Sequence, residues 1–494
     1  MPSRLPRPLL RGPRGVVACG HPLAAGAGIA TFRDGGGAVD AALAAAAVLA
    51  VVMPESCGLG GDAFMLVRSP QGEVTAVNGS GAAGSAVDPS RVEEGPGSVA
   101  VPGFVAALDD AHSLFARLSL ERLLEPAVSL AGGGFPVGGS LLAAIAERRD
   151  ALERGAPGWA LLDPGLRAGS LVRAPALAGL LQRIGRGGRQ AFYGGQMARA
   201  IERAVGGSLS AEDLAAHTTV VRAPVRGSFR GHEVWAQPPV SQALIAPMVL
   251  HALERSGASE PADRAHVSVE ALEAAFQHRH EIAADGAEER LLGARLDIDP
   301  ERAQRRGGPT HGLHTTSVTA ADSDGVVVSM LISVYASFGS GVLVPEGGFV
   351  LNDRLSGCST EPGSSNYPAP GRRPVHTLSP ALVSDGARAF ALATPGADGQ
   401  VQTLVQLIDA IASDGARVNH ALERPRWRSG NGRLLIEDDY DADVARELER
   451  RGHDLVRIAP GTTVTFGIAV SSGIDEHGTP FAASDSRGSW AAAG

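Results

Sequence analysis

The fold is decided in the stretch His314-Thr315-Thr316-Ser317-Val318-Thr319-Ala320-Ala321-Asp322, where a threonine pair opens an expected β-strand deep inside the chain. A threonine hydroxyl is a poor nucleophile unless a base lies beside it. A cut between His314 and Thr315 would provide that base, because the new α-amine of Thr315 would lie next to its own hydroxyl. The polar segment 293–313, which contains Arg and Gly, is expected to be a loop in which such a cut could occur.

The composition of the chain is that of a globular enzyme. Its 494 residues are 44% hydrophobic and could form one large α/β unit or two to three domains. The formal net charge of −9 argues against a nucleic-acid partner, which would require a basic face. The three cysteines lack CxxC spacing, so we expect no disulfide framework, no metal site and no cofactor.

The N-terminal residues 1–14 are rich in Arg and Pro, and we expect them to be disordered. They contain no apolar stretch typical of a signal peptide, which favours a cytoplasmic location. The apolar run from Ala38 to Met53 contains Asp40 and is too short to cross a bilayer, so we expect no membrane partner. Its Ala-rich part, 38–52, predicts a helix buried in the core.

The rest of the chain divides into a mainly helical part and a strand-rich part. Before Thr315, segments 103–204 and 240–292 have helical patterns, and strands are expected at 15–19, 63–68 and 74–78. After Thr315, a helix is expected at 400–412 and strands at 325–334, 348–352, 389–394, 433–437 and 463–470. This change in pattern places the expected cut at a natural division of the chain.

Short motifs in a fixed order resemble the γ-glutamyltranspeptidase family of N-terminal nucleophile hydrolases over nearly the whole chain. They are Gly35-Gly36-Gly37-Ala38-Val39-Asp40, Gly58-Leu59-Gly60-Gly61, Pro102-Gly103-Phe104, Glu212-Asp213-Leu214-Ala215, Pro238-Pro239, Thr315-Thr316 and Ser484-Asp485-Ser486-Arg487. The resemblance implies an α/β (α+β) fold, a four-layer αββα sandwich. It also implies a large subunit, 15–314, and a small subunit, 315–494, which form one unit after self-cleavage.

The resemblance also assigns catalytic roles. Thr315 matches the nucleophile, and Ser333 matches a second hydroxyl that positions it. In the family, a Gly-Gly pair supplies backbone N–H groups to the oxyanion of the tetrahedral intermediate. Here Gly396 and Ala397 take those places, and alanine can serve because only the backbone N–H is used.

The substrate pocket departs from the family pattern. No arginine lies near Asn78-Gly79-Ser80-Gly81, where the family binds the substrate α-carboxylate, and Gly357 replaces the aspartate that holds the α-amine. These changes predict an acyl specificity other than γ-glutamyl. The remaining candidates for substrate binding are Tyr335, Arg354, His376 and Thr377, whose donors suit an acyl chain with a carboxylate or keto oxygen. This pattern resembles the branch of oxamate amidohydrolases and dicarboxylyl-amide acylases.

The sequence leaves several functions open. They are an amidohydrolase or acyltransferase with altered specificity, a true γ-glutamyl hydrolase or transpeptidase, a hydrolase of C–C bonds next to a carbonyl, and an unprocessed inactive relative with a binding role. A second copy of the motif, His217-Thr218-Thr219, is interpreted as structural and shows that the three letters alone decide little. The expected partners are a small-molecule amide and the two subunits of one precursor, with a dimer of these left open.

Overall fold

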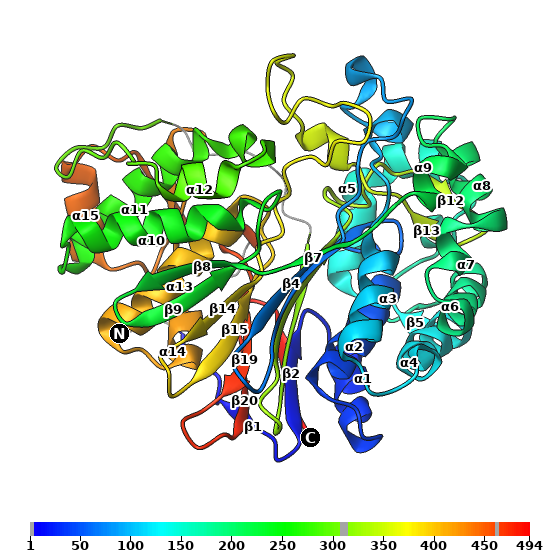
Figure 1. The fold of residues 1–494 in the computed structure, drawn as a ribbon, viewed down its shortest axis with the longest axis horizontal. Coiled ribbons are helices and arrows are strands. Elements are labelled where there is room, and N and C mark those ends of the chain that lie inside the picture. Colours follow the sequence, from blue (N-terminus) through cyan, green and yellow to red (C-terminus); the bar gives the residue numbers. More distant parts are fainter. Residues whose placement is uncertain (1–3, 307–314, 460–463) are drawn as a thin grey trace.

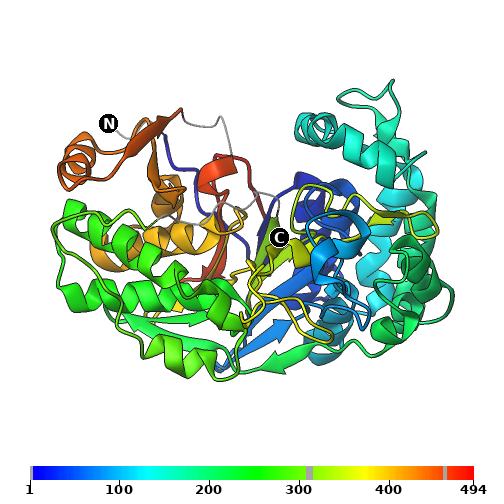
Figure 2. The same cartoon turned by 90° about the horizontal axis from the view of Figure 1, so that it is seen from above.

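The computed structural model describes residues 4–306, 315–459 and 464–494. Two seven-stranded sheets lie face to face, and helices cover the outer face of each (Figure 1). The view from above shows the same sequence of layers, with one helical layer on each side (Figure 2). The predicted four-layer αββα architecture is therefore confirmed.

The first sheet joins the two halves of the chain. Its strands, in spatial order, are β21 (Trp490–Ala493), β2 (Gly15–Cys19), β10 (Thr316–Asp322), β11 (Val327–Ser333), β3 (Asp62–Arg68), β4 (Val74–Asn78) and β7 (Val220–Arg222). All neighbours are antiparallel, and β10 pairs with β2 on one side and with β11 on the other. The strand that follows the expected cut is thus central to a sheet built largely from residues that precede it.

The second sheet has the order β1 (Leu10–Arg11), β20 (Pro480–Ser484), β19 (Val470–Ile474), β15 (Ala389–Ala393), β14 (Ala381–Ser384), β9 (His232–Ala236) and β8 (Val225–Phe229). Apolar side chains of different sizes, such as Phe64, Leu331 and Ala391, fill the space between the sheets. Two hydroxyl contacts cross this space: Ser329 Oγ donates to the Leu392 carbonyl at 2.9 Å, and the Thr319 and Ser472 hydroxyls lie 2.9 Å apart.

Each outer layer is helical (Figure 1). The first sheet is covered by α1 (Pro22–Arg33), α2 (Ala38–Val52), α3 (Phe104–Phe115), α4 (Leu120–Gly133), α5 (Gly139–Gly155), α6 (Pro175–Gly187), α7 (Gln190–Tyr193), α8 (Gly195–Ala204) and α9 (Ala211–Ala215). The second is covered by α10 (Ile245–Ser256), α11 (Pro261–Phe276), α12 (Ala287–Leu292), α13 (Gly399–Asp414), α14 (Val418–Glu423) and α15 (Ala442–Arg450).

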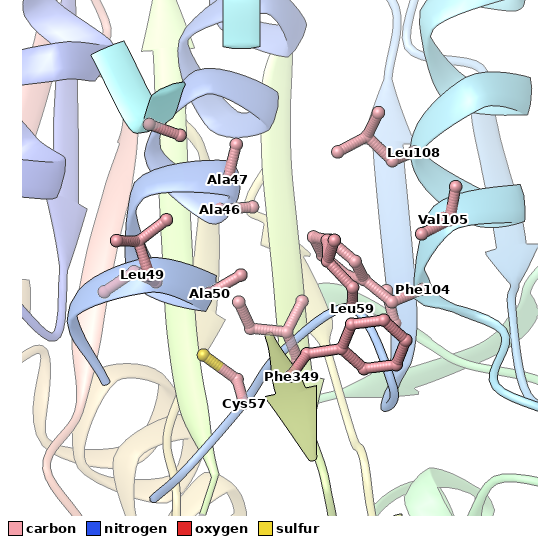
Figure 3. Close-up of a cluster of buried hydrophobic side chains, with 14 of the residues drawn as sticks. Ala46, Ala47, Leu49, Ala50, Cys57, Leu59, Phe104, Val105, Leu108 and Phe349 are labelled. Carbon is pink, nitrogen blue, oxygen red and sulfur yellow. The ribbon is translucent and has the colours of Figure 1, made fainter. Parts of the chain in front are cut away.

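Helix α2 lies at the centre of the first helical layer. All fifteen of its residues are buried, as the Ala-rich run predicted. Figure 3 shows Ala46, Ala47, Leu49 and Ala50 of this helix in a cluster that also contains Phe104 and Phe349. Alanine suits such a position, because small side chains let the helix lie close to its neighbours on every side.

Two expectations about the chain differ from the structure. Of the N-terminal segment expected to be disordered, residues 4–14 are described: Leu10–Arg11 pairs with β20, and Arg7 Nη1 donates to the Ser489 carbonyl. The strand expected at 463–470 is wrong for its described part, because Val464–Phe466 forms a 3₁₀ turn and β19 begins only at Val470. In the described part of the chain, no helix is long and apolar enough to cross a membrane.

Candidate active site

Thr315 lies immediately before β10, opposite the end of β11. Its hydroxyl donates to Ser333 Oγ at 3.2 Å, and only 6% of the residue is exposed. Ser333 Oγ also accepts the backbone N–H of Tyr335 at 2.9 Å. The register of the two strands produces this contact, since Thr316 pairs with Ile332 and leaves Thr315 beside Ser333. His314, the residue on the other side of the expected cut, lies outside the described residues.

Tyr335 has a left-handed backbone, with φ of 83°, which is costly for a non-glycine residue and is concentrated at functional sites. Burial raises the pKa of its phenol to about 12, although the charges of Arg279 and Arg354 oppose that rise. A Cβ built on Gly357 would lie 2.7 Å from the phenol oxygen. The Tyr335 ring therefore fills the space beside Gly357.

Arg354 is completely buried and lies over the Tyr335 ring, with the guanidinium carbon 4.4 Å from the ring centroid. Its Nε donates to Asp62 Oδ2 at 3.2 Å. Its Nη1 and Nη2 have no hydrogen-bond partner among the described residues. A buried guanidinium with two unsatisfied nitrogens is costly, so this arrangement suits an anionic or carbonyl ligand.

His376, in the segment that precedes β14, reaches the same carboxylate. Its Nε2 lies 3.0 Å from Asp62 Oδ2, and its Nδ1 accepts the N–H of Leu378 at 3.2 Å, so the ring proton lies on Nε2. Burial, together with the charge of Arg354, lowers the pKa of His376 to about 4. Burial opposes ionisation of Asp62, but the hydrogen bond from His376 and the charge of Arg354 hold the Asp62 pKa below its usual range. Both His376 nitrogens are engaged within the protein, whereas Arg354 keeps two nitrogens without a partner among the described residues.

The predicted oxyanion turn links β15 to α13. Gly396 has φ of 124° and Ala397 has φ of 48°, both in the left-handed half of conformational space. The Gln242 side chain donates to the Ala397 carbonyl at 3.2 Å and to the Thr377 carbonyl at 3.5 Å. Among the described residues, no acceptor binds the N–H of Gly396 or Ala397. The turn also precedes the N-terminus of a 16-residue helix, whose dipole favours negative charge there.

A second buried arginine, Arg279, lies beside this turn. Arg279 Nε lies 3.4 Å from Asp398 Oδ1 and donates to Gln242 Oε1 at 3.3 Å, and all three side chains are buried. The contacts of Ser333, Asp62 and Gln242, whose N–H donates to the His376 carbonyl, link the predicted site residues Thr315, Ser333, Tyr335, Arg354, His376, Thr377 and Ala397, and Gly396 adjoins Ala397 in the turn. Thr377 takes part through its carbonyl, and these contacts assign no role to its side chain.

Three members of this network escape prediction from the sequence: Asp62, Arg279 and Gln242. Asp62 carried a usable signal, since it is a carboxylate between Gly60-Gly61 and a buried apolar strand, where a charge requires a partner. Arg279 lies between His278 and His280. The described residues contain no group of three or more His, Cys, Asp or Glu side chains placed to hold a metal ion.

Comparison with known proteins agrees with this geometry. The family model for gamma-glutamyltranspeptidase matches residues 24–494. The chain is 32% identical to the oxamate amidohydrolase proenzyme of Klebsiella pneumoniae, covering 97% of this chain and 98% of the relative. It is 33% identical to the acylase ACY 1 proenzyme of Pseudomonas sp. strain V22, covering 90% and 88% of the two chains.

A solved structure shares the same fold over its full length. The crystal structure of cephalosporin acylase from Bacillus halodurans superimposes with a TM-score of 0.88 and 28% identity, covering 100% of this chain and 98% of that chain. The relatives are hydrolases of the N-terminal nucleophile type, and those compared by sequence are named as proenzymes. The chain belongs to the γ-glutamyltranspeptidase family of N-terminal nucleophile hydrolases.

Proposed function

We propose that this protein is a self-processing threonine amidohydrolase whose acyl group is not γ-glutamyl. In the first stage, Thr315 Oγ attacks the carbonyl carbon of residue 314. The peptide C–N bond breaks as an ester forms, and the Thr315 nitrogen takes the proton that the hydroxyl loses. Water then hydrolyses the ester, which leaves a carboxylate on residue 314 and a free amine and hydroxyl on Thr315. The hydrogen bond from Thr315 to Ser333 at the head of β10 supports this assignment.

In the second stage, the Thr315 amine acts as the base. A free α-amine has a pKa of roughly 7.7–8.0 and so accepts the hydroxyl proton near neutral pH. Oγ attacks the substrate amide, and the N–H groups of Gly396 and Ala397 stabilise the oxyanion. The proton passes to the leaving amine as the amide C–N bond breaks. Water, or another amine, then releases the acyl group from Thr315 Oγ.

The acyl group itself is proposed to carry a carboxylate or keto oxygen that Arg354 binds. The observation that carries this proposal is the buried Arg354 guanidinium, whose two Nη atoms lack partners among the described residues. Oxamate, from which one relative takes its name, has a carboxylate next to its amide carbonyl. The phenol beside Gly357 argues against a γ-glutamyl α-amine, because Tyr335 stands where an acidic partner would be needed.

Intact mass and N-terminal sequencing of the purified protein test the first stage. We expect two fragments, with the smaller one beginning at Thr315, and a single uncut chain for Thr315→Ala. The chain offers a matched control in its second His-Thr-Thr motif: Thr218→Ala, at an exposed position, should be cut like the wild type. An intact wild-type chain would instead favour the unprocessed relative with a binding role.

A panel of 4-nitroanilides tests the acyl specificity. Anilides of oxalic and succinic acid present a carboxylate near the scissile carbonyl, butyryl anilide has none, and γ-glutamyl anilide adds an α-amine. We expect release of nitroaniline from the acidic anilides ahead of the other two. Preferred release from γ-glutamyl anilide would overturn the proposed specificity while leaving the nucleophile in place.

A further inference from the structure

The segment that precedes β19 packs directly on the oxyanion turn. Gly467, with φ of 76°, follows the 3₁₀ turn Val464–Phe466 and contacts Thr394 and Pro395. A Cβ built on Gly467 would lie 2.4 Å from Thr394 Oγ1 and 3.2 Å from the Pro395 carbonyl oxygen. The Thr394 hydroxyl and the Pro395 carbonyl therefore lie directly against Gly467, with no room for a side chain there.

Three side chains hold the segment by its carbonyl groups. Arg426 Nη1 donates to the carbonyls of Phe466 at 2.8 Å and Gly467 at 3.2 Å. Thr403 Oγ1, on α13, donates to the Phe466 carbonyl at 3.2 Å. Arg428 Nη1 donates to the Thr465 carbonyl at 2.8 Å. These contacts fix the segment relative to the helix that begins at the oxyanion turn.

Arg426 is fixed in turn by the carboxylate of Asp485. The arginine is 1% exposed and Asp485 is 0% exposed, and Arg426 Nη2 donates to Asp485 Oδ2 at 2.7 Å. Asp485 Oδ2 also accepts the N–H of Ala469 at 3.2 Å, while Oδ1 accepts from Arg487. A buried ion pair of this kind adds little stability compared with apolar packing. The planar guanidinium of Arg426 instead fixes the geometry of the groups that it binds.

We propose that Arg426 and Asp485 are positioning residues for the oxyanion turn. They hold residues 465–467 against Thr394–Gly396, so that the N–H groups of Gly396 and Ala397 keep their direction while charge develops on the substrate oxygen. The turn needs such support, because two successive residues with positive φ are not held by local preference. This inference rests on the proposed function, which assigns the oxyanion to that turn.

The test is Arg426→Lys. Lysine retains the charge opposite Asp485 but cannot donate to two carbonyls and a carboxylate in one plane. We expect kcat on the best anilide of the panel to fall about 10- to 100-fold, with KM changed less than threefold, because oxyanion donors act on the transition state. The pH midpoint of kcat should not move, since the Thr315 amine is untouched. Arg424→Lys is the matched control: this neighbouring arginine pairs with Asp414 outside the site and should retain wild-type kcat.

Gly467→Ala disturbs the contact between Gly467 and Thr394–Pro395 directly and leaves the Arg426–Asp485 pair intact. It should lower kcat in the same way, and the burst of nitrophenol from 4-nitrophenyl acetate should slow in both variants, because this small ester requires no acyl pocket. Wild-type kcat and burst rate in either folded variant, or a change confined to KM, would overturn the proposal. If Thr315→Ala retains the burst, the proposed function itself fails. If that variant is inactive and the Arg426 and Gly467 variants behave as the wild type, only the positioning role fails.

Discussion

The Arg354 guanidinium lies over the Tyr335 ring at 4.4 Å, and the backbone N–H of that same tyrosine binds the Ser333 hydroxyl that accepts from Thr315. Ser333 and Tyr335 thus link the expected nucleophile to the buried cation. A substrate that reaches both Thr315 and Arg354 must carry its anionic or carbonyl group a short distance from the scissile bond. The position of Arg354 relative to Thr315 therefore limits which acyl groups the nucleophile can attack.

Arg354→Lys should weaken discrimination for acidic acyl groups. Lysine retains a charge for Asp62 but loses the fork and the stacking on Tyr335. A hydrogen bond to a charged group contributes about 1.5–3 kcal/mol, which corresponds to a loss of about 10- to 100-fold. We expect kcat/KM for succinyl anilide to fall by this factor, while that for butyryl anilide changes little. An equal fall for both anilides would mean that Arg354 acts on the fold and not on the acyl group.

Glu55 should make the protein less stable as the pH rises. The residue is 6% exposed, its carbonyl accepts the N–H of Phe338, and burial raises its pKa to about 7. The folded state therefore binds a proton that the unfolded state releases near pH 4.5. Stability is retained below pH 4.5 and is lost as the pH rises to 7, by about 3 kcal/mol at most. Urea unfolding should show Glu55→Gln gaining on the wild type between pH 5 and 8; a difference independent of pH would contradict the assignment.

His376 should make the protein less stable as the pH falls. Its folded pKa of about 4 lies below the ordinary value of 6.5, so the folded state binds fewer protons. Its contribution is present above pH 6.5 and is lost as the pH falls through 4, again by about 3 kcal/mol. His376→Gln, which retains a donor toward Asp62, should unfold with a shallower dependence on pH between 6.5 and 4. Parallel curves for the two proteins would show that another group titrates.

Ala397→Gly should be tolerated. Relief of the left-handed strain at φ of 48° favours glycine by about 1–2 kcal/mol, and the greater freedom of glycine in the unfolded chain offsets about 1 kcal/mol of that gain. We expect a change in unfolding free energy within about 1 kcal/mol and a kcat within a few-fold of the wild type. Ala397→Val is the contrast, because a β-branched residue rarely adopts this backbone conformation. It should lose both stability and turnover, and equal behaviour of the two variants would contradict the left-handed geometry of the turn.

Much of the fold follows from local pattern. The Ala-rich run of α2 and the β-branched run of β11 lie in the elements that their periodicity predicted. The exceptions involve short or distant contacts. Strand β1 has two residues and exists because it pairs with β20, more than 460 residues away along the chain. The turn at Val464–Phe466 has the β-branched composition of a strand. Its carbonyls, however, accept hydrogen bonds from Arg426 and Arg428 and not from a neighbouring strand.

The amino-acid sequence by itself determined the family, the layers of the fold and the threonine at which the chemistry is proposed, because ordered motifs and hydrophobic periodicity are local properties of the chain. Only the tertiary structure decided which polar groups are satisfied. In the sequence, His376 and Arg354 are equally plausible donors. In the structure both nitrogens of His376 are engaged, whereas Arg354 keeps two nitrogens without partners in the described chain. The physical reason is that Asp62 comes from a strand about 300 residues away and lies between them. Its carboxylate accepts one hydrogen bond from each side chain, and a buried donor left without an acceptor is costly.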